Sequence, residues 1–120
     1  MGSIGAVLEA VEAGTVTISC TARDSLTQQH GLLHGGVIAS LADVACGYAA
    51  LSLMPDDKEV LTVEFKINFL RPATTERVVA VAKVVQSGRT LTVCEASVFD
   101  SSQTKLVAKM TATMMSIDLR

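Results

Sequence analysis

Asp43 is the only charged residue in the stretch GGVIASLADVACGYAA (residues 35–50), where small and apolar side chains dominate. Burying a carboxylate is costly unless a cation compensates its charge, yet residues 35–53 contain neither Lys nor Arg. A carboxylate retained in such a setting can serve as a nucleophile or as a general base. Asp43 is therefore the first candidate for a catalytic residue.

Gly35 and Gly36 stand where this apolar run begins. The first turn of a helix offers unpaired N–H groups and the positive end of the helix dipole. Glycine at such a position lets a ligand oxygen come close to the backbone. The pair is consistent with a site that polarises a carbonyl group, although glycine near a helix start is more often only a cap.

Two other kinds of site are less well supported. His30 and His34 are four residues apart, as in zinc-binding helices, but Gly31 occupies the place of the glutamate in H-E-x-x-H, so we expect no metal site. His34, Ser40 and Asp43 suggest a catalytic triad. On one helix, however, His34 and Ser40 would be separated by roughly 9 Å of rise, against a hydrogen-bond reach of about 3 Å. A triad within one chain is not expected.

The hydrophobic patterns predict one helix and five or six mostly antiparallel strands. The helix covers about residues 35–53 and is apolar on most sides, which predicts that it is buried. Strands are expected at residues 6–12, 15–22, 59–70, 77–86, 90–99 and 104–117. In EVLTVEFKINFL (59–70), Leu61 and Phe65 should share one face and Thr62 the other. The last three connections are short enough to join antiparallel neighbours. We predict an α+β fold with a long antiparallel β-sheet wrapped around one central helix.

Composition limits the class of protein. The 120 residues suffice for a single domain, and 49% hydrophobic residues with a net charge of −2 favour self-association. The sequence has no basic block, few aromatic residues and no apolar run of transmembrane length, so neither nucleic acid nor membrane is an expected partner. No secretory signal is recognisable. Cys20, Cys46 and Cys94 lie in apolar segments, as expected for buried free thiols of a cytoplasmic protein.

The stretch HGLLHGGVIASLADVACGYAA (30–50) resembles the helix-opening motif of hotdog-fold acyl-CoA thioesterases, of the PaaI-like and 4-hydroxybenzoyl-CoA thioesterase type. The shared pattern is HGG, then small apolar residues, then an acid eight positions after the first glycine. The resemblance continues through VEFKINFLRPA (63–73) and around SGRT (87–90). It implies a hotdog fold, hydrolysis of an acyl-CoA thioester without a cofactor, and homodimers that pair again into a dimer of dimers, a homotetramer.

The resemblance also implies roles for individual residues. Gly35 would supply the N–H that polarises the thioester carbonyl, and Asp43 would be the nucleophile or general base. Gln28 stands where members have Asn or Gln to orient water or substrate, and Thr62 matches a Ser or Thr that assists the water. Gln in place of Asn leaves the role of residue 28 open. His34, beside these residues, would help to bind substrate, as would Gly36.

Arginines next to turns are candidates for binding the phosphates of coenzyme A. Arg89 follows the turn residues Ser87 and Gly88, which we include in the expected substrate-binding set, and Arg71 follows a predicted strand. Two solvated arginines at turns are an equally good interpretation of the same positions.

Helix geometry makes a prediction about assembly. Gly35 and Asp43 are eight residues apart, which is about 12 Å of helical rise, so both cannot contact one thioester carbonyl within one chain. If both act, Gly35 of one chain faces Asp43 of another, and a homodimer shares two equivalent sites. A non-catalytic acyl-CoA-binding hotdog protein and a hotdog hydratase or dehydratase remain alternatives, although the position of Asp43 argues against the second. The sequence does not specify the acyl group.

Overall fold

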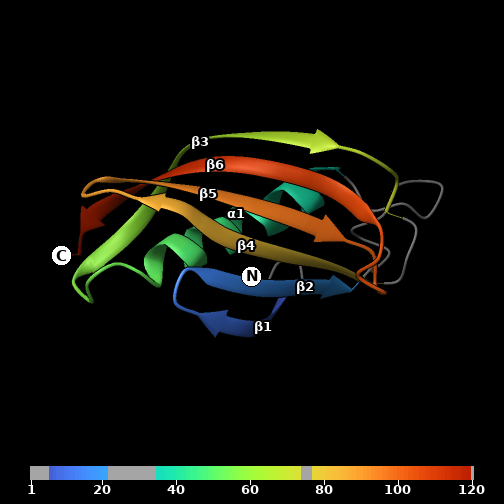
Figure 1. Cartoon of the computed structure of the whole chain (residues 1–120), viewed down its shortest axis with the longest axis horizontal. Helices are drawn as coiled ribbons and strands as arrows, with labels where there is room; N and C mark the ends of the chain where they lie inside the picture. Colours follow the sequence, from blue (N-terminus) through green and yellow to red (C-terminus); the bar gives the residue numbers. More distant parts are fainter. Residues whose placement is uncertain (1–5, 22–34, 74–76, 120) are drawn as a thin grey trace.

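The computed structural model of this chain describes residues 6–21, 35–73 and 77–119. Six antiparallel strands form one curved sheet along one side of a single helix (Figure 1). The elements are β1 (Ala6–Glu12), β2 (Thr15–Thr21), α1 (Gly35–Leu51), β3 (Lys58–Phe69), β4 (Arg77–Ser87), β5 (Leu91–Phe99) and β6 (Leu106–Asp118). The predicted helix, strands and α+β architecture are confirmed, with boundaries that differ by a few residues at most.

The order of strands in the sheet differs from one expectation. It is β1-β2-β4-β5-β6-β3, so β3 pairs with β6 and not with β4 as its short connection suggested. The connection between Phe69 and Arg77 has seven residues, which can span up to roughly 23 Å. Crossing two intervening strands takes only about 14 Å. A short connection therefore does not force β3 and β4 to be neighbours.

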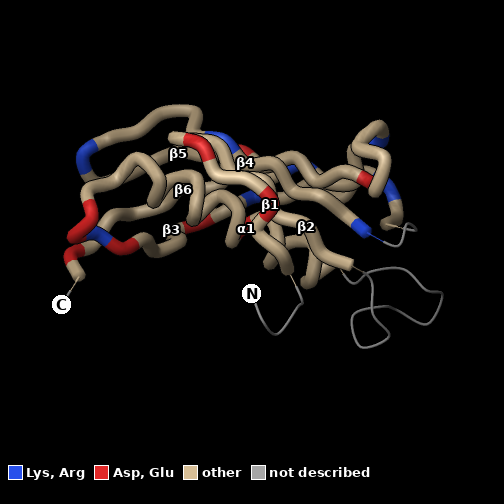
Figure 2. The backbone as a smooth tube through the Cα atoms, turned by 90° about the horizontal axis from the view of Figure 1, so that it is seen from below, with Lys and Arg blue, Asp and Glu red and all other residues tan. Residues whose placement is uncertain are grey.

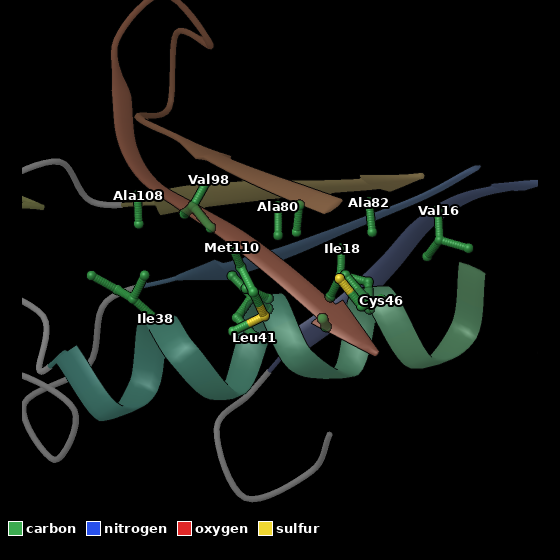
Figure 3. Close-up of a cluster of buried hydrophobic side chains, with 14 of the residues drawn as sticks. Val16, Ile18, Ile38, Leu41, Cys46, Ala80, Ala82, Val98, Ala108 and Met110 are labelled. Atoms are coloured by element: carbon green, nitrogen blue, oxygen red, sulfur yellow. The ribbon is translucent and has the colours of Figure 1, made fainter. Parts of the chain in front are cut away.

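The core lies between α1 and the concave face of the sheet (Figure 3). The helix contributes mostly small side chains, so the sheet can approach it closely. Its buried residues are Ile38, Leu41, Ala42, Ala45, Cys46, Ala49 and Ala50. The expectation of a fully buried helix is wrong. Among the residues that the structure describes, Gly36, Ser40 and Tyr48, on the side of α1 opposite the core, are exposed. The sheet covers one face of the helix only.

Strand β3 contains a β-bulge that changes which side chains face the helix. The register with β6 shifts just after Thr62, so that Thr62 lies opposite Met114 and Phe65 lies opposite Ala112. Met114 and Ala112 both belong to the core, which places Thr62 and Phe65 on the same face although they are three residues apart. Simple alternation assigned Leu61 to that face, and this is wrong because a bulge adds one residue to the strand.

The three cysteines are free and buried, as predicted. The thiol of Cys94 donates a hydrogen bond to the backbone oxygen of Cys46 at 3.5 Å. Burial raises the pKa of Cys46 to about 12 and that of Cys94 to about 11, so both remain protonated thiols at neutral pH. No helix in the described ranges is long and apolar enough to cross a membrane.

Acidic and basic residues gather at the end of the molecule near the C-terminus (Figure 2). Lys58 at the start of β3 pairs there with Asp118 at the end of β6, and this pairing holds the pKa of Asp118 below its usual range. The edge strand β3 is thus fixed to its neighbour by charge at this end and by backbone hydrogen bonds along its length.

Candidate active site

Asp43 and Thr62 meet between α1 and β3. The hydroxyl of Thr62 donates a hydrogen bond to Oδ1 of Asp43 at 2.8 Å, and the same hydroxyl lies 3.4 Å from Sδ of Met114. The bulge in β3 makes this contact possible because it turns Thr62 toward the helix. Two residues proposed for the site from the sequence, 19 positions apart, are therefore brought together.

The setting of Asp43 differs from the buried, unpartnered carboxylate that the sequence suggested. Its side chain is half-buried and accepts a hydrogen bond. None of the ion pairs among the described residues includes it. Partial exposure and the hydrogen bond from Thr62 both lower the cost of placing this carboxylate on the helix. Thr62 holds Oδ1, and Oδ2 has no hydrogen-bond partner in the part of the chain described, so that oxygen is available for chemistry.

Beside this pair lies a pocket of about 300 Å³ between α1 and β3. Volumes of this size are at the lower end of those used by small-molecule sites. The helix supplies residues three or four positions apart and β3 supplies the facing wall. The lining consists of Asp43, Val44, Gly47, Tyr48, Leu51, Glu59, Val60 and Thr62. The carboxylate therefore opens onto a groove whose other helical residues are mainly apolar.

Gly35 and Asp43 lie on one continuous helix, as predicted. Gly35 is the first residue of α1, and a Cβ added to it would lie 3.3 Å from Cζ of Phe69, at the end of β3. Eight residues of helix separate it from Asp43 by about 12 Å. One chain therefore does not bring both residues to one carbonyl group. Gly36 is exposed and a Cβ there would meet nothing within 4 Å.

The two arginines proposed for phosphate binding lie at opposite ends of the molecule. Arg71 follows the end of β3, whereas Arg89 lies in the turn between β4 and β5 (Figure 1). Strand β5 runs between these two ends and is nine residues long, about 26 Å. Both side chains are exposed. Within one chain they do not converge on a single phosphate.

The turn that carries Arg89 explains its neighbouring glycine. The N–H of Gly88 donates to the backbone oxygen of Leu91 at 2.9 Å, and a Cβ at Gly88 would lie only 2.6 Å from that oxygen. Glycine is thus required here by the backbone of the turn. Ser87, the last residue of β4, is exposed. The predicted roles of Gln28 and His34, and the rejected zinc interpretation of His30, concern residues outside the ranges described.

The groove contains residues that sequence reasoning did not single out. Val44, Gly47, Tyr48 and Leu51 follow Asp43 at helical spacing on the side of α1 that faces the edge strand β3. A signal for them was present, because a helix containing an acid must present neighbours one and two turns away on the same side. Nothing in the sequence revealed that β3 would face that side.

Comparison with known proteins decides the family. The sequence model of the Thioesterase superfamily matches residues 30–107, a range that contains the helix, the Asp43–Thr62 pair and the whole of strands β3, β4 and β5. The chain belongs to the thioesterase superfamily. Its predicted family, its assignment to the thioesterases and its hotdog fold are thereby confirmed.

Individual proteins resemble this thioesterase over most of its length. A thioesterase family protein of Silicibacter pomeroyi has 46% sequence identity and a TM-score of 0.93, covering 98% of this chain and 88% of its own. The PaaI protein of Escherichia coli has the same fold, with a TM-score of 0.88, 24% identity, and coverage of 99% and 86%. A 1,4-dihydroxy-2-naphthoyl-CoA hydrolase of Listeria monocytogenes is 28% identical over 84% of this chain and 82% of its own.

Proposed function

We propose that this thioesterase hydrolyses the thioester of a small aryl- or acyl-coenzyme A to the free acid and CoA. The observation that carries the proposal is the Asp43 carboxylate, oriented by Thr62 at the edge of an apolar groove. The Listeria relative is named as a hydrolase of an aryl-CoA, and a relative in Escherichia coli, 29% identical over 70% of this chain, as a medium/long-chain acyl-CoA thioesterase. Buried free thiols favour the cytoplasm as its location.

The chemistry requires few groups. A thiol has a pKa near 8.5, so the thiolate of CoA leaves without a strong general acid. Asp43 attacks the carbonyl carbon to form an acyl-enzyme anhydride that water then hydrolyses, or it removes a proton from a water molecule that attacks directly. In either route one water molecule is consumed, and the acid and the CoA thiol are released. The N–H of Gly35 stabilises the oxyanion, a contribution of about 3 kcal/mol.

We propose that this N–H comes from a second copy of the chain. Strand β3 is one edge of the sheet, so one side of its backbone is unpaired among the residues that the structure describes. It is long, and Val63, Phe65 and Phe69 are 53%, 44% and 53% exposed. An exposed apolar edge strand of this kind readily pairs with another strand. Pairing of two β3 strands would join two sheets into one.

The register of such a pair follows from the site. If two antiparallel β3 strands meet around a two-fold axis at Lys66, Phe69 of one copy lies opposite Thr62 of the other, because the bulge in β3 adds Val63 as an extra residue. Phe69 is next to Gly35, and Thr62 is bonded to Asp43. This register therefore brings the start of one helix to the carboxylate of the second chain. It also brings Arg71 of one copy toward the end of the other copy that carries Arg89, as one CoA site requires.

A dimer of dimers has a candidate surface on the outer face of the sheet. Leu61, Met115 and Leu91 are direct cross-strand neighbours on β3, β6 and β5. Leu61 and Leu91 are 48% and 50% exposed. These three side chains form an apolar patch on the face that does not contact α1, and its burial in a tetramer would remove it from water.

The proposed function is tested by measuring thiol release from a panel of acyl-CoAs in the presence of a thiol-reactive dye. Wild type should release CoA, and Asp43→Asn should lower kcat by at least about 10² because the base or nucleophile is lost. The melting temperature should change little, since asparagine can still accept the Thr62 hydrogen bond. Comparable hydrolysis by Asp43→Asn would contradict the role of Asp43. Binding without thiol release would favour the acyl-CoA-binding alternative, and hydration of an enoyl-CoA without thiol release the hydratase.

A further inference from the structure

The hydroxyl of Thr62 lies within hydrogen-bonding distance of two acceptors. Oδ1 of Asp43 is 2.8 Å from Oγ1 of Thr62, and Sδ of Met114 is 3.4 Å from the same oxygen. A hydroxyl carries one proton, so it can donate to only one of these two atoms at a time. A charged carboxylate is much the stronger acceptor, and a thioether sulfur is a weak one. The proton of Thr62 therefore points to Asp43 whenever the carboxylate carries its charge.

Met114 is held in a fixed place behind Thr62. It lies directly opposite Thr62 on β6, its side chain is fully buried, and it belongs to the core between the sheet and α1. Thr62 itself is exposed and lines the groove beside Asp43. Water can thus reach Thr62 from the groove but cannot reach the sulfur on the other side of it. The bulge in β3 creates this arrangement, because it turns Thr62 toward both the helix and Met114.

Hydrolysis by the proposed routes removes the charge of Asp43 for part of each cycle. In the anhydride route one oxygen of Asp43 carries the acyl group, and in the other route Asp43 holds the proton taken from water. A hydrogen bond to a neutral acceptor is roughly half as strong as one to a charged acceptor. The hold of Asp43 on Thr62 is therefore weakest while the anhydride waits for water, or while the tetrahedral intermediate expels CoA.

We propose that Met114 is a positioning residue of this thioesterase, whose sulfur keeps the Thr62 hydroxyl in place while Asp43 is uncharged. The proton of Thr62 turns from Oδ1 of Asp43 to Sδ of Met114, and it returns when the carboxylate is regenerated. This is a rotation of the hydroxyl alone, in which no covalent bond forms or breaks. With its proton on the sulfur, Oγ1 of Thr62 presents its lone pairs to the groove, where it accepts a hydrogen bond from water. The inference rests on the proposed function, because it uses the loss of charge on Asp43 during hydrolysis.

The kinetic test removes the sulfur and keeps the size of the side chain. Leucine replaces methionine in packed cores at small cost. Met114→Leu should lower kcat for an acyl-CoA roughly two- to tenfold, the range expected for one neutral hydrogen bond. KM should stay within about twofold, because the buried side chain does not contact substrate. The loss should be smaller than in Thr62→Val, since Met114 acts only through Thr62.

A double-mutant cycle separates positioning from packing. In the Thr62→Val background, Met114→Leu should change kcat by less than about 1.5-fold, because no hydroxyl is left to position. Met110→Leu is the matched control, since Met110 is also fully buried on the same face of β6 but lies opposite Ile67. It should change kcat by less than about 1.5-fold as well. An unchanged kcat in Met114→Leu, or an equal loss with and without the Thr62 hydroxyl, would overturn the inference.

A second way of removing the sulfur applies if Met114→Leu does not fold. Norleucine incorporated in place of every methionine keeps the length of the side chain and replaces only the sulfur atom. The kcat should then fall in the wild-type sequence and stay unchanged in Thr62→Val. A fall in both proteins by the same factor would contradict the role of Met114.

The position of Thr62 can also be measured without turnover. Three-bond NMR couplings to the γ-methyl carbon of Thr62 report which side-chain rotamer it adopts. One rotamer should dominate in wild type, in Asp43→Ala and in Met114→Leu, because each of these proteins retains at least one acceptor. Several rotamers should be populated only when Asp43→Ala and Met114→Leu are combined. Averaging in Asp43→Ala alone, or a single rotamer in the combined variant, would argue against the sulfur as a second acceptor.

These measurements distinguish failure of this inference from failure of the proposed function. Hydrolysis by wild type that is insensitive to Met114→Leu would leave the thioesterase activity standing and overturn the role of Met114. If wild type hydrolyses no acyl-CoA, the proposed function fails and the catalytic role of Met114 fails with it. The rotamer measurement then still decides whether the sulfur positions Thr62.

Discussion

Replacing Thr62 by valine tests whether the hydrogen bond to Asp43 matters for catalysis. Valine has nearly the same shape and is equally suited to a β-strand, so the substitution removes the hydroxyl and little else. The lost interaction is the 2.8 Å hydrogen bond to Oδ1 of Asp43. Thr62→Ser keeps a hydroxyl and is the matched control.

The size of the effect follows from the strength of this bond. A hydrogen bond to a charged group contributes about 1.5–3 kcal/mol, and the lower end applies because Asp43 is only half-buried. Without the bond, the carboxylate distributes over other staggered side-chain conformations. If the activation free energy rises by about 1–2 kcal/mol because Asp43 is less well positioned, kcat should decrease roughly 5- to 30-fold. The free energy of unfolding should decrease by about 1 kcal/mol at most, because the site is partly open to water.

The assay is steady-state thiol release from an acyl-CoA, with unfolding in urea as a parallel measurement. Thr62→Val should lower kcat by the stated factor with little change in KM, and Thr62→Ser should stay within about threefold of wild type. Both effects should be smaller than that of Asp43→Asn. Unchanged kcat in Thr62→Val, or equal damage in Thr62→Ser, would refute the idea that this hydroxyl positions Asp43.

Further predictions address the shared site, CoA binding and the buried thiols. Mixing Asp43→Ala chains with Gly35→Pro chains should restore about half of wild-type activity per mixed dimer, because one site then carries both defects and the other site carries none. If activity does not recover after subunit exchange has been proven, the shared site is contradicted. Gly35→Pro alone removes an N–H at a helix position that tolerates proline and should lower kcat by roughly 10²–10³, whereas Gly35→Ala keeps that N–H and should retain most activity in the same assay. Arg89→Ala should raise KM for acyl-CoA and weaken its salt dependence without affecting a short thioester that lacks the nucleotide, and equal loss on both substrates would argue against phosphate binding. Burial raises the pKa of Cys46 to about 12 and that of Cys94 to about 11, so the unfolded chain loses these protons at lower pH than the folded chain. The free energy of unfolding, measured in urea, should therefore fall as the pH rises from about 9 toward 12. A constant free energy of unfolding over that range would contradict this prediction.

The elements of the fold could be predicted because their signals are local. A 3.6-residue period in residues 35–51 and a two-residue period in the strands depend only on neighbouring side chains. The pairing of β3 with β6 could not be predicted, because it is a choice between distant strands that all have similar apolar faces. The bulge after Thr62 was hidden for a related reason: Leu61, Val63 and Phe65 continue a perfect alternation through it.

The candidate site was partly accessible from the sequence. Asp43 was found from its own surroundings, since a single acid in an apolar helix requires an explanation. Its partner Thr62 was suggested by resemblance to a family and not by the strand pattern, which pointed it away from the helix. Gly47 was missed because a glycine in a helix made of small residues is inconspicuous until the facing strand is known.

The bulge divides β3 into two halves whose side chains alternate independently. Before the bulge the even-numbered residues face the helix, and after it the odd-numbered residues do. A point mutation in one half therefore does not change which side chains of the other half face the helix. Insertions and deletions act differently. Loss of the single residue Val63 would remove the bulge and restore uniform alternation, but Thr62 would stay opposite Met114 and beside Asp43, because the pairing with β6 already skips this position. Relatives that lack one residue at this position are therefore expected to keep the Thr62–Asp43 pair on an unbulged strand.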